Sequence, residues 1–255
     1  MISQYKPTER FSMKVDNYVK YRPHYPPQVV ELLAAACGLT PEWVIADIGS
    51  GTGFSAELFL QNGNRVFGIE PNAPMRAAGE AYLAAYPNFT NVAATAEETT
   101  LPDASIDMAL AGQAFHWFDQ ERARPELLRI MKPGAWLTLM WNSRDDASPF
   151  QRDYEQFVLQ FGTDYSEIRH QNVSRDALER FYGPAGLSAA EIPQAQIVDF
   201  AGLAGRVLSS SYMPGPDHER YEAMLAELRR LFDRHAVDGR LSLDLKTQVF
   251  WGRLS

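Results

Sequence analysis

Between Trp43 and Trp141, short β-rich runs alternate with segments whose apolar residues recur at helical spacing. The β-rich runs cover residues 43–48, 65–70, 90–94, 106–111 and 135–141, and the helical segments cover 54–61, 73–85 and roughly 119–131. Strands that alternate with helices form a parallel sheet covered on both faces. The pattern therefore predicts a doubly wound α/β core.

Helix start and stop signals support this division of the chain. Asn72 is a suitable cap for the second helix, with Pro74 in its first turn, and Lys132-Pro133-Gly134 is expected to end the third. Pro125 lies inside the third helix, so the helix either kinks there or begins near that residue.

The flanks of the core have a different pattern. A proline-stiffened segment (21–27) precedes an apolar helix, and after Trp141 the alternation weakens into helices and loops that suit a lid. A strand within 187–200 must lie at a sheet edge or contain a bulge, because Pro193 cannot donate to a ladder. An amphipathic helix follows over 221–232, and period-two apolar residues predict a closing strand over 243–251.

Charge and cysteine content limit the possible functions. The formal net charge is -8, whereas nucleic-acid binding needs a basic face, and no apolar stretch is long enough to span a membrane. Cys37 is the single cysteine, and its apolar neighbours favour a buried thiol over a nucleophile. No secretory signal is recognisable at the N-terminus. A cytoplasmic protein is expected.

The stretch 45–57, IADIGSGTGFSAE, places a glycine-rich turn between the first strand and its helix. In a doubly wound sheet this turn is the usual ligand site. A dinucleotide fingerprint has the spacing G-x-G-x-x-G, but Phe54 occupies the third glycine position and the extra glycine falls at Gly53. The turn also lacks the Lys-Ser/Thr of a phosphate-binding loop, which argues against a triphosphate.

Three further motifs follow the turn in order. The second run ends at Glu70, about 20 residues after the first glycine, where a carboxylate accepts hydrogen bonds from ribose hydroxyls. The next two are NVAATAEETTLPDASIDMALAGQAFHWF and LLRIMKPGAWLTLMW. With Asp47 and the alternate glycines, these motifs resemble those of class I S-adenosylmethionine-dependent methyltransferases. The flanking YRPHYP and the C-terminal region resemble the type 11 and trans-aconitate methyltransferase-like group more weakly.

The resemblance implies a Rossmann-like seven-stranded sheet whose last strand is antiparallel. It also implies one methyltransferase domain over residues 1–255, with a cofactor-binding core at about 40–142. An N-terminal lid segment at about 1–39 and a cap on the substrate side at about 143–240 are expected to flank this core.

The same resemblance implies S-adenosylmethionine as the cofactor and assigns residues to its parts. The turn Gly49–Gly53 is expected at the methionyl and ribose portion, Glu70 at the ribose, and Ala96 with Glu97 at the adenine edge. Met75 either packs on the adenine face or belongs to the core, and Arg22 either binds the methionyl carboxylate or is solvated. The full expected cofactor set is Tyr18, Arg22, Asp47, Gly49, Ser50, Gly51, Thr52, Gly53, Glu70, Pro71, Met75, Ala96, Glu97 and Gln113.

The acceptor side has fewer signals. His116 is the candidate general base, but a role in orienting its loop is favoured, because many acceptors, carboxylates included, need no base. Trp117, Trp141 and Tyr212 are candidates for an acceptor pocket or for the core, and Arg144 for an anionic acceptor or for the surface. The histidines lack ligand spacing, so no metal site is expected.

The expected activity is methyl transfer from S-adenosylmethionine to a small molecule, preferably to an oxygen of a carboxylate or hydroxyl, with nitrogen and carbon acceptors left open. Two alternatives remain: a nicotinamide-dependent oxidoreductase, and a non-catalytic protein that binds S-adenosylmethionine. The glycine spacing and the Ala96-Glu97 motif disfavour the oxidoreductase. The acceptor and the oligomeric state are open.

Overall fold

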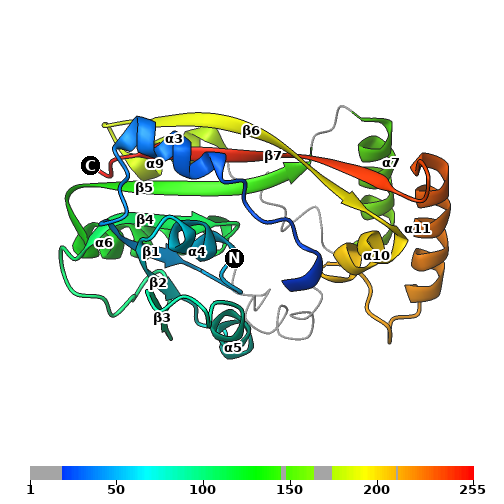
Figure 1. Ribbon diagram of the computed structural model, residues 1–255, viewed down its shortest axis with the longest axis horizontal. Helices are drawn as coiled ribbons and strands as arrows, with labels where there is room; N and C mark the ends of the chain where they lie inside the picture. The colour runs from blue at the N-terminus through cyan, green and yellow to red at the C-terminus, as the bar shows by residue number, and fades with distance from the viewer. Residues whose placement is uncertain (1–18, 145–147, 164–173, 211) are drawn as a thin grey trace.

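The computed structural model describes residues 19–144, 148–163, 174–210 and 212–255. Its centre is a seven-stranded sheet with the order β3-β2-β1-β4-β5-β7-β6 (Figure 1). The strands are β1 (Val44–Ile48), β2 (Arg65–Ile69), β3 (Phe89–Val92), β4 (Ile106–Gly112), β5 (Met131–Arg144), β6 (Leu187–Val198) and β7 (Leu241–Gly252). This order makes β1 and β4 neighbours, so their carboxyl ends meet where the chain crosses from one half of the sheet to the other.

The strand directions confirm the predicted sheet. The first five strands pair in parallel, whereas β7 is antiparallel to both of its neighbours, β5 and β6. Pro193 lies in β6, which forms a sheet edge, as its missing N–H requires.

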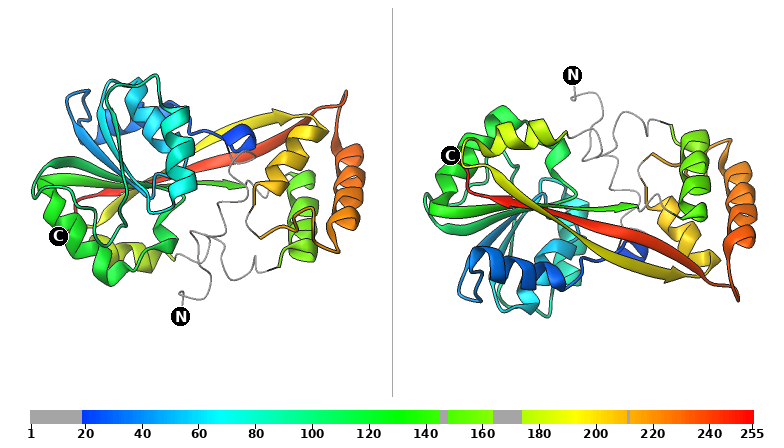
Figure 2. Two further views of the ribbon diagram at one scale, coloured as in Figure 1. Left: turned by 90° about the horizontal axis from the view of Figure 1, so that it is seen from below. Right: turned by 90° about the horizontal axis from the view of Figure 1, so that it is seen from above.

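Helices cover both faces of the sheet (Figure 2). α3 (Gln28–Cys37), α4 (Phe54–Gln61) and α5 (Ala73–Tyr82) lie on one face, and α6 (Gln120–Ile130) and α9 (Arg175–Tyr182) lie on the other. The first face is filled by apolar side chains such as Leu33 and Phe59 against Ile45 and Met108.

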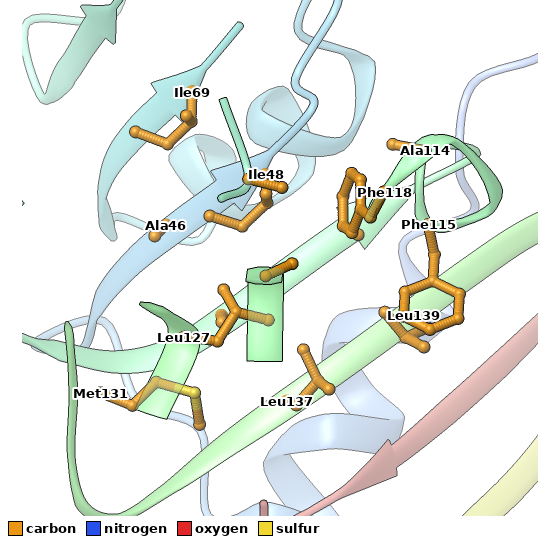
Figure 3. Packing of buried hydrophobic residues seen from close by; sticks show 14 of the residues in the cluster. Ala46, Ile48, Ile69, Ala114, Phe115, Phe118, Leu127, Met131, Leu137 and Leu139 are labelled. Carbon is orange, nitrogen blue, oxygen red and sulfur yellow. The ribbon is translucent and has the colours of Figure 1, made fainter. Parts of the chain in front are cut away.

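The core under the second face runs up to the end of β4, where a short 3-10 helix, η2 (Phe115–Trp117), begins. Figure 3 shows Ile48 of β1, Leu137 and Leu139 of β5, and Phe115 and Phe118 of the loop after β4 within this cluster. Apolar packing therefore fixes the loop that faces the glycine turn.

A separate apolar cluster lies beyond the core sheet. It contains α7 (Pro149–Phe161), α10 (Phe200–Leu208), α11 (Tyr221–His235) and the adjoining ends of β6 and β7, and we call this unit the cap (Figure 1). The predicted face of α11 is confirmed, with Met224, Leu228 and Phe232 buried. None of the helices in the described parts of the chain is long and apolar enough to cross a membrane.

Several predicted boundaries change in the structure. α6 begins at Gln120, capped by the Asp119 side chain, and it runs through Pro125, so the later start is wrong. α6 ends at Ile130, and residues 132–134 lie inside the longer strand β5. α5 ends at Tyr82, three residues before the predicted end.

Within the predicted cap range, α9 packs on the core sheet and not with the cap helices. Tyr182 is fully buried, and its hydroxyl donates to the carbonyl oxygens of Leu137 and Phe250, each at 3.2 Å. These two bonds join α9 to β5 and β7.

Candidate active site

The turn between β1 and α4 lies at the carboxyl edge of the sheet. The N–H groups of Gly49 and Ser50 donate to the carbonyl oxygen of Ile69 at 2.8 and 3.1 Å, which fastens the turn to the end of β2. The Gly53 N–H donates back to the Ser50 carbonyl at 2.8 Å. The turn is therefore held by backbone bonds before any ligand is considered.

In this turn Gly49 has no room for a side chain, whereas Gly51 has a backbone angle that side chains rarely adopt. Gly49 has φ +72°, and a Cβ placed on it would lie 2.6 Å from the Cβ of Ala114. Gly51 has φ +56°, and a Cβ there would lie 3.3 Å from Cε of Met75. Both backbone angles also disfavour L side chains. The sequence motif therefore corresponds to a turn that leaves its backbone open at the strand ends.

Glu70 lies directly opposite the turn. Its Oε2 accepts from the Gly51 N–H at 3.0 Å and its Oε1 from the Asn72 N–H at 2.8 Å, and the residue is 9% exposed. Burial raises the pKa of this carboxyl above its ordinary value, while the two backbone N–H bonds oppose the rise. Each oxygen keeps a further lone pair that can accept from a ligand hydroxyl.

Asp47 is fully buried beneath the turn. Its Oδ2 accepts from the Ser55 hydroxyl at 2.7 Å, which joins β1 to the first turn of α4. Burial raises the pKa of Asp47 to about 7, and the bonds from Ser55 and the Ala56 backbone oppose this rise. Among the described residues its Oδ1 has no hydrogen-bond partner. The geometry of Asp47 is that of a support for the turn.

The residues expected at the ribose and adenine lie on the next elements. Asn72 caps α5 as predicted, accepting from the Met75 N–H at 3.0 Å, and Met75 is 5% exposed beside Gly51. Glu97 Oε1 accepts from the N–H of Asp119, the capping residue of α6. The remaining expected residues near this end are Ser50, Thr52, Pro71 and Ala96, and all but Pro71 are buried.

Gln113 follows β4 in a left-handed conformation, with φ +58°. Its Nε2 donates to the backbone oxygen of Asn142 on β5 at 3.0 Å. Asn142, which was not predicted, also donates through Nδ2 to the carbonyls of Pro23 and His24, each at 3.3 Å. A polar residue near the end of a buried strand is the signal that would have revealed it. Asn142 connects the cofactor edge to the N-terminal segment.

The N-terminal segment also packs on α4 through a cluster that sequence reasoning missed. The His24 ring stacks on Phe54 with centroids 4.3 Å apart, and His24 Nδ1 lies 3.2 Å from Glu57 Oε2. The Tyr82 hydroxyl donates to the same oxygen at 2.6 Å. Phe54, the residue that replaces the third glycine of a dinucleotide motif, therefore packs against the N-terminal segment through the His24 ring.

Arg22 points toward the cap. Its Nε donates to the Ser209 hydroxyl at 2.9 Å and its Nη2 to the Ser210 hydroxyl at 3.1 Å, just after α10. Its expected bond to a methionyl carboxylate stays a prediction. Tyr18, the other expected residue of this segment, lies outside the described residues.

The candidates for the acceptor side divide into two groups. Arg144 pairs with Glu155 of α7, and its guanidinium lies 5.3 Å from the centroid of the Tyr154 ring, so it faces the cap. Trp141 is 3% exposed and packs edge-to-face on Phe115 and Phe250 in the core under α6 and α9. The structure does not bring Trp141 together with Arg144.

The other three acceptor candidates also lie in two separate places, the loop after β4 and the cap. His116 and Trp117 adjoin each other in η2, with ring centroids 4.9 Å apart. Tyr212 packs against the apolar cluster of the cap, and its backbone oxygen accepts from the Thr163 N–H at 3.0 Å. Tyr212 thus belongs with Arg144, and His116 and Trp117 belong with the loop after β4.

Cysteine and metal chemistry have little support in the described parts of the chain. Burial raises the pKa of the Cys37 thiol to about 11, which keeps it protonated at neutral pH. Among the described residues no group of three or more His, Cys, Asp or Glu side chains is gathered as a metal site would require.

Comparison with known proteins fits this geometry. A family model described as a methyltransferase domain matches residues 46–139, which contain the glycine turn, Glu70 and Gln113. Over this region the chain is similar to class I S-adenosylmethionine-dependent methyltransferases. S-adenosylmethionine is the cofactor of these methyltransferases. The resemblance to the trans-aconitate methyltransferase-like group stays a prediction.

Individual relatives match different shares of this chain. An uncharacterized methyltransferase of Mycobacterium tuberculosis is 33% identical over 62% of this chain, and the match spans 61% of that relative. A malonyl-[acyl-carrier protein] O-methyltransferase of Marinomonas sp. is 23% identical over 87% of this chain and 84% of its own. A solved structure from Anaeromyxobacter dehalogenans, provisionally classed as a type II methyltransferase, has a TM-score of 0.68 at 21% identity and covers 92% of this chain and 98% of that one. The last comparison shows the fold.

Proposed function

We propose that this protein transfers a methyl group from S-adenosylmethionine to an oxygen of a small molecule, a carboxylate or a hydroxyl. The observation that carries the proposal is the Glu70 carboxylate bonded to the Gly51 N–H at 3.0 Å. In a dinucleotide fold, the amides of this turn face a pyrophosphate. Here a carboxylate holds one of them, which disfavours a phosphate and suits a ligand with hydroxyl donors and positive charge.

The residues present fit the cofactor, because the turn leaves space where a Cβ of Gly51 would stand and Glu70 supplies acceptors. We assign the ribose hydroxyls to Glu70, and the methionyl portion to Gly49, Gly51 and Gln113. Met75, Ala96 and Glu97 are assigned to the adenine. When bound, the cofactor supplies a methyl group activated by the positive charge of its sulfonium.

The chain contributes position and exclusion of water more than proton transfer. Transfer to a carboxylate needs no base, since the attacking oxygen carries no proton, whereas transfer to a hydroxyl needs an acceptor for its proton. His116, after β4, is the candidate for that second case. The name of the Marinomonas relative, an O-methyltransferase, supports oxygen as the accepting atom. The cytoplasmic location expected from the sequence stays a prediction.

A methyl-transfer screen tests this proposal. The full chain is incubated with labelled S-adenosylmethionine and separate panels of carboxylates, phenols, alcohols and amines, and the products are identified by mass spectrometry. We expect a methyl ester or ether together with an equal amount of S-adenosylhomocysteine. Methylation of amines alone would contradict oxygen transfer. Cofactor binding without transfer to any panel would favour the non-catalytic alternative.

A further inference from the structure

Three arginines from distant parts of the chain meet between the core sheet and the cap. Arg22 comes from the N-terminal segment, Arg144 from the end of β5 and Arg206 from α10. All three act electrostatically on the Tyr154 hydroxyl, and Arg22 and Arg144 both act on Arg206. We call Arg22, Arg144 and Arg206 the arginine cluster.

Arg206 is the member of this cluster that lies on α10. The residue is half-buried, and its Nη1 donates to Gln196 Oε1 on β6 at 2.8 Å. Burial, followed by repulsion from Arg22, lowers the pKa of Arg206 to about 10, so it is still a cation at neutral pH. The Gln196 amide is neutral and leaves the positive charge in place. A partly buried guanidinium near two others is stabilised when an anion joins it.

Arg144 pairs with Glu155, whereas hydrogen bonds to neutral groups position Arg22 and Arg206. Gln196 Nε2 donates to the Tyr21 carbonyl at 3.1 Å, and the Ser209 hydroxyl, which accepts from Arg22, donates to the Arg206 carbonyl at 2.6 Å. The Tyr21 ring packs directly on Gly205 of α10, where a side chain would collide with it. Figure 2 shows the start of the described chain beside α10 in both views. These contacts fix the direction of the guanidiniums.

The cluster adjoins the expected methyl-transfer zone. Arg144 lies two residues after Asn142, whose backbone oxygen accepts from Gln113. Arg22 precedes Pro23, whose carbonyl accepts from the Asn142 side chain. A ligand bound at the arginine cluster therefore lies on the cap side of Gln113.

We propose that the arginine cluster binds an anionic group of the methyl acceptor, with Arg206 and Arg144 as its main partners. This inference rests on the proposed function and names the acceptor class, a small organic anion. Arginine forks bind carboxylates and phosphates by the same paired hydrogen bonds, and both chemistries fit the cluster. Arg206 was not predicted from the sequence, because it is one of several basic residues on amphipathic helices.

Binding and transfer experiments on the full chain separate the two proposals. Calorimetry with small di- and tricarboxylates, phosphate monoesters and their neutral amides or esters is run with and without saturating S-adenosylhomocysteine. The same compounds are then tested as methyl acceptors. We expect at least one anion to bind and be methylated, and its neutral counterpart to do neither. The carboxylate and phosphate arms show which anion is used.

Matched variants test the arginines themselves. Arg206→Gln is expected to weaken anion binding by about 10-fold or more, the scale for losing a charged hydrogen bond, and to leave S-adenosylhomocysteine affinity within about 2-fold. Arg206→Lys keeps the positive charge but lacks the paired donors of a guanidinium. Its anion affinity is expected to lie between those of the wild type and Arg206→Gln. Arg230→Gln, on the exposed face of α11, is the control and should change neither affinity. Arg144→Gln gives the same test if Arg206→Gln fails to fold.

The outcomes distinguish the failure of each proposal. The anion proposal is overturned if no anion binds the wild-type chain, if neutral counterparts are methylated as well as the acids, or if folded Arg206→Gln and Arg144→Gln keep wild-type anion affinity. A wild-type chain that neither binds S-adenosylhomocysteine nor transfers a methyl group would instead overturn the proposed function. In that case, anion binding measured without cofactor would still test whether the arginine cluster binds anions.

Discussion

The glycine turn and the arginine cluster lie at the same edge of the sheet, but the chain assembles them differently. The turn depends on contacts between near neighbours in sequence, such as Gly51 with Glu70, 19 residues apart. In the cluster, Arg22 and Ser209 are 187 residues apart, and Tyr21 and Gln196 are 175 apart. The first site is a product of one β-α-β unit. The second forms only when the N-terminal segment and the cap pack together.

This difference bears on how the two sites tolerate change. The glycine turn is fixed by backbone bonds and by glycines that a Cβ would disrupt, so few sequences can build it. The arginine cluster consists of side chains on helices and strand ends, where substitution alters binding while the backbone stays the same. We therefore expect variants of the turn to affect the cofactor and stability together, and variants of Arg144 and Arg206 to affect the acceptor alone.

Gly49→Ala should have the largest effect. An alanine at φ +72° costs about 1–2 kcal/mol, and the overlap with Ala114 adds about 1–3 kcal/mol. Gly38→Ala is the matched control, because Gly38 has φ +75° and no heavy atom within 4 Å of its added Cβ. Urea unfolding should show the greater loss for Gly49→Ala, together with lost S-adenosylhomocysteine binding. Equal losses in the two variants would show that the close packing of the turn is unimportant.

Asp47→Asn tests the buried support of the turn through pH. The pKa of Asp47 is about 7 in the folded chain against 3.8 for an ordinary aspartate, so between these values the folded state holds the extra proton. Stability from this group is therefore present at low pH and is lost as pH rises through about 7, by on the order of 2–4 kcal/mol.

The asparagine variant lacks this titration, so its stability relative to wild type should rise between pH 5 and pH 8. Urea unfolding at several pH values measures the difference, and other titrating groups cancel because both proteins contain them. A difference that stays constant with pH would mean that Asp47 is ionised in the folded protein throughout this range.

Glu70→Ala should weaken S-adenosylhomocysteine binding by about 1–3 kcal/mol, as expected for the loss of a charged acceptor. Glu70→Gln keeps one acceptor oxygen and should lose less. Glu80→Ala, at an exposed position of α5, is the control and should bind as wild type does. Unchanged affinity in folded Glu70→Ala, measured by calorimetry, would remove Glu70 from the ribose site.

Asp199→Ala gives the smallest expected effect and tests whether the cap is independent of the cofactor. The Asp199 side chain caps α10 by accepting from the Gly202 N–H at 2.8 Å, and its removal should cost about 1 kcal/mol of stability. Because α10 carries Arg206, acceptor binding should weaken slightly, while calorimetry should show unchanged S-adenosylhomocysteine affinity. A large loss of cofactor affinity would show that the two regions are coupled.

The same contrast explains what was predictable from the sequence. The turn, Glu70 and the cap at Asn72 were predictable because glycine spacing, strand ends and capping residues act over a few positions. Pro125 was ambiguous because local preference disfavours it inside α6, whereas Asp119 and the packing of Leu127 maintain the helix around it.

The acceptor side was predicted less completely because its contacts join distant segments. Arg206 and Asn142 have ordinary local surroundings, and their partners are known only once the sheet order brings β5, β6 and α10 together. Tryptophan is a residue type that often lines pockets, but the Trp141 side chain on β5 packs against Phe115 and Phe250. Such orientations depend on strand pairing, which periodicity alone does not determine.

Calorimetric titration of the wild-type chain with S-adenosylhomocysteine and, in parallel, with NADH is the most direct test of the central claim that the glycine turn serves a methyl donor. We predict saturable binding of S-adenosylhomocysteine and no binding of NADH, because Phe54 replaces the third glycine and Glu70 holds the Gly51 amide. Binding of NADH without binding of S-adenosylhomocysteine would contradict the account.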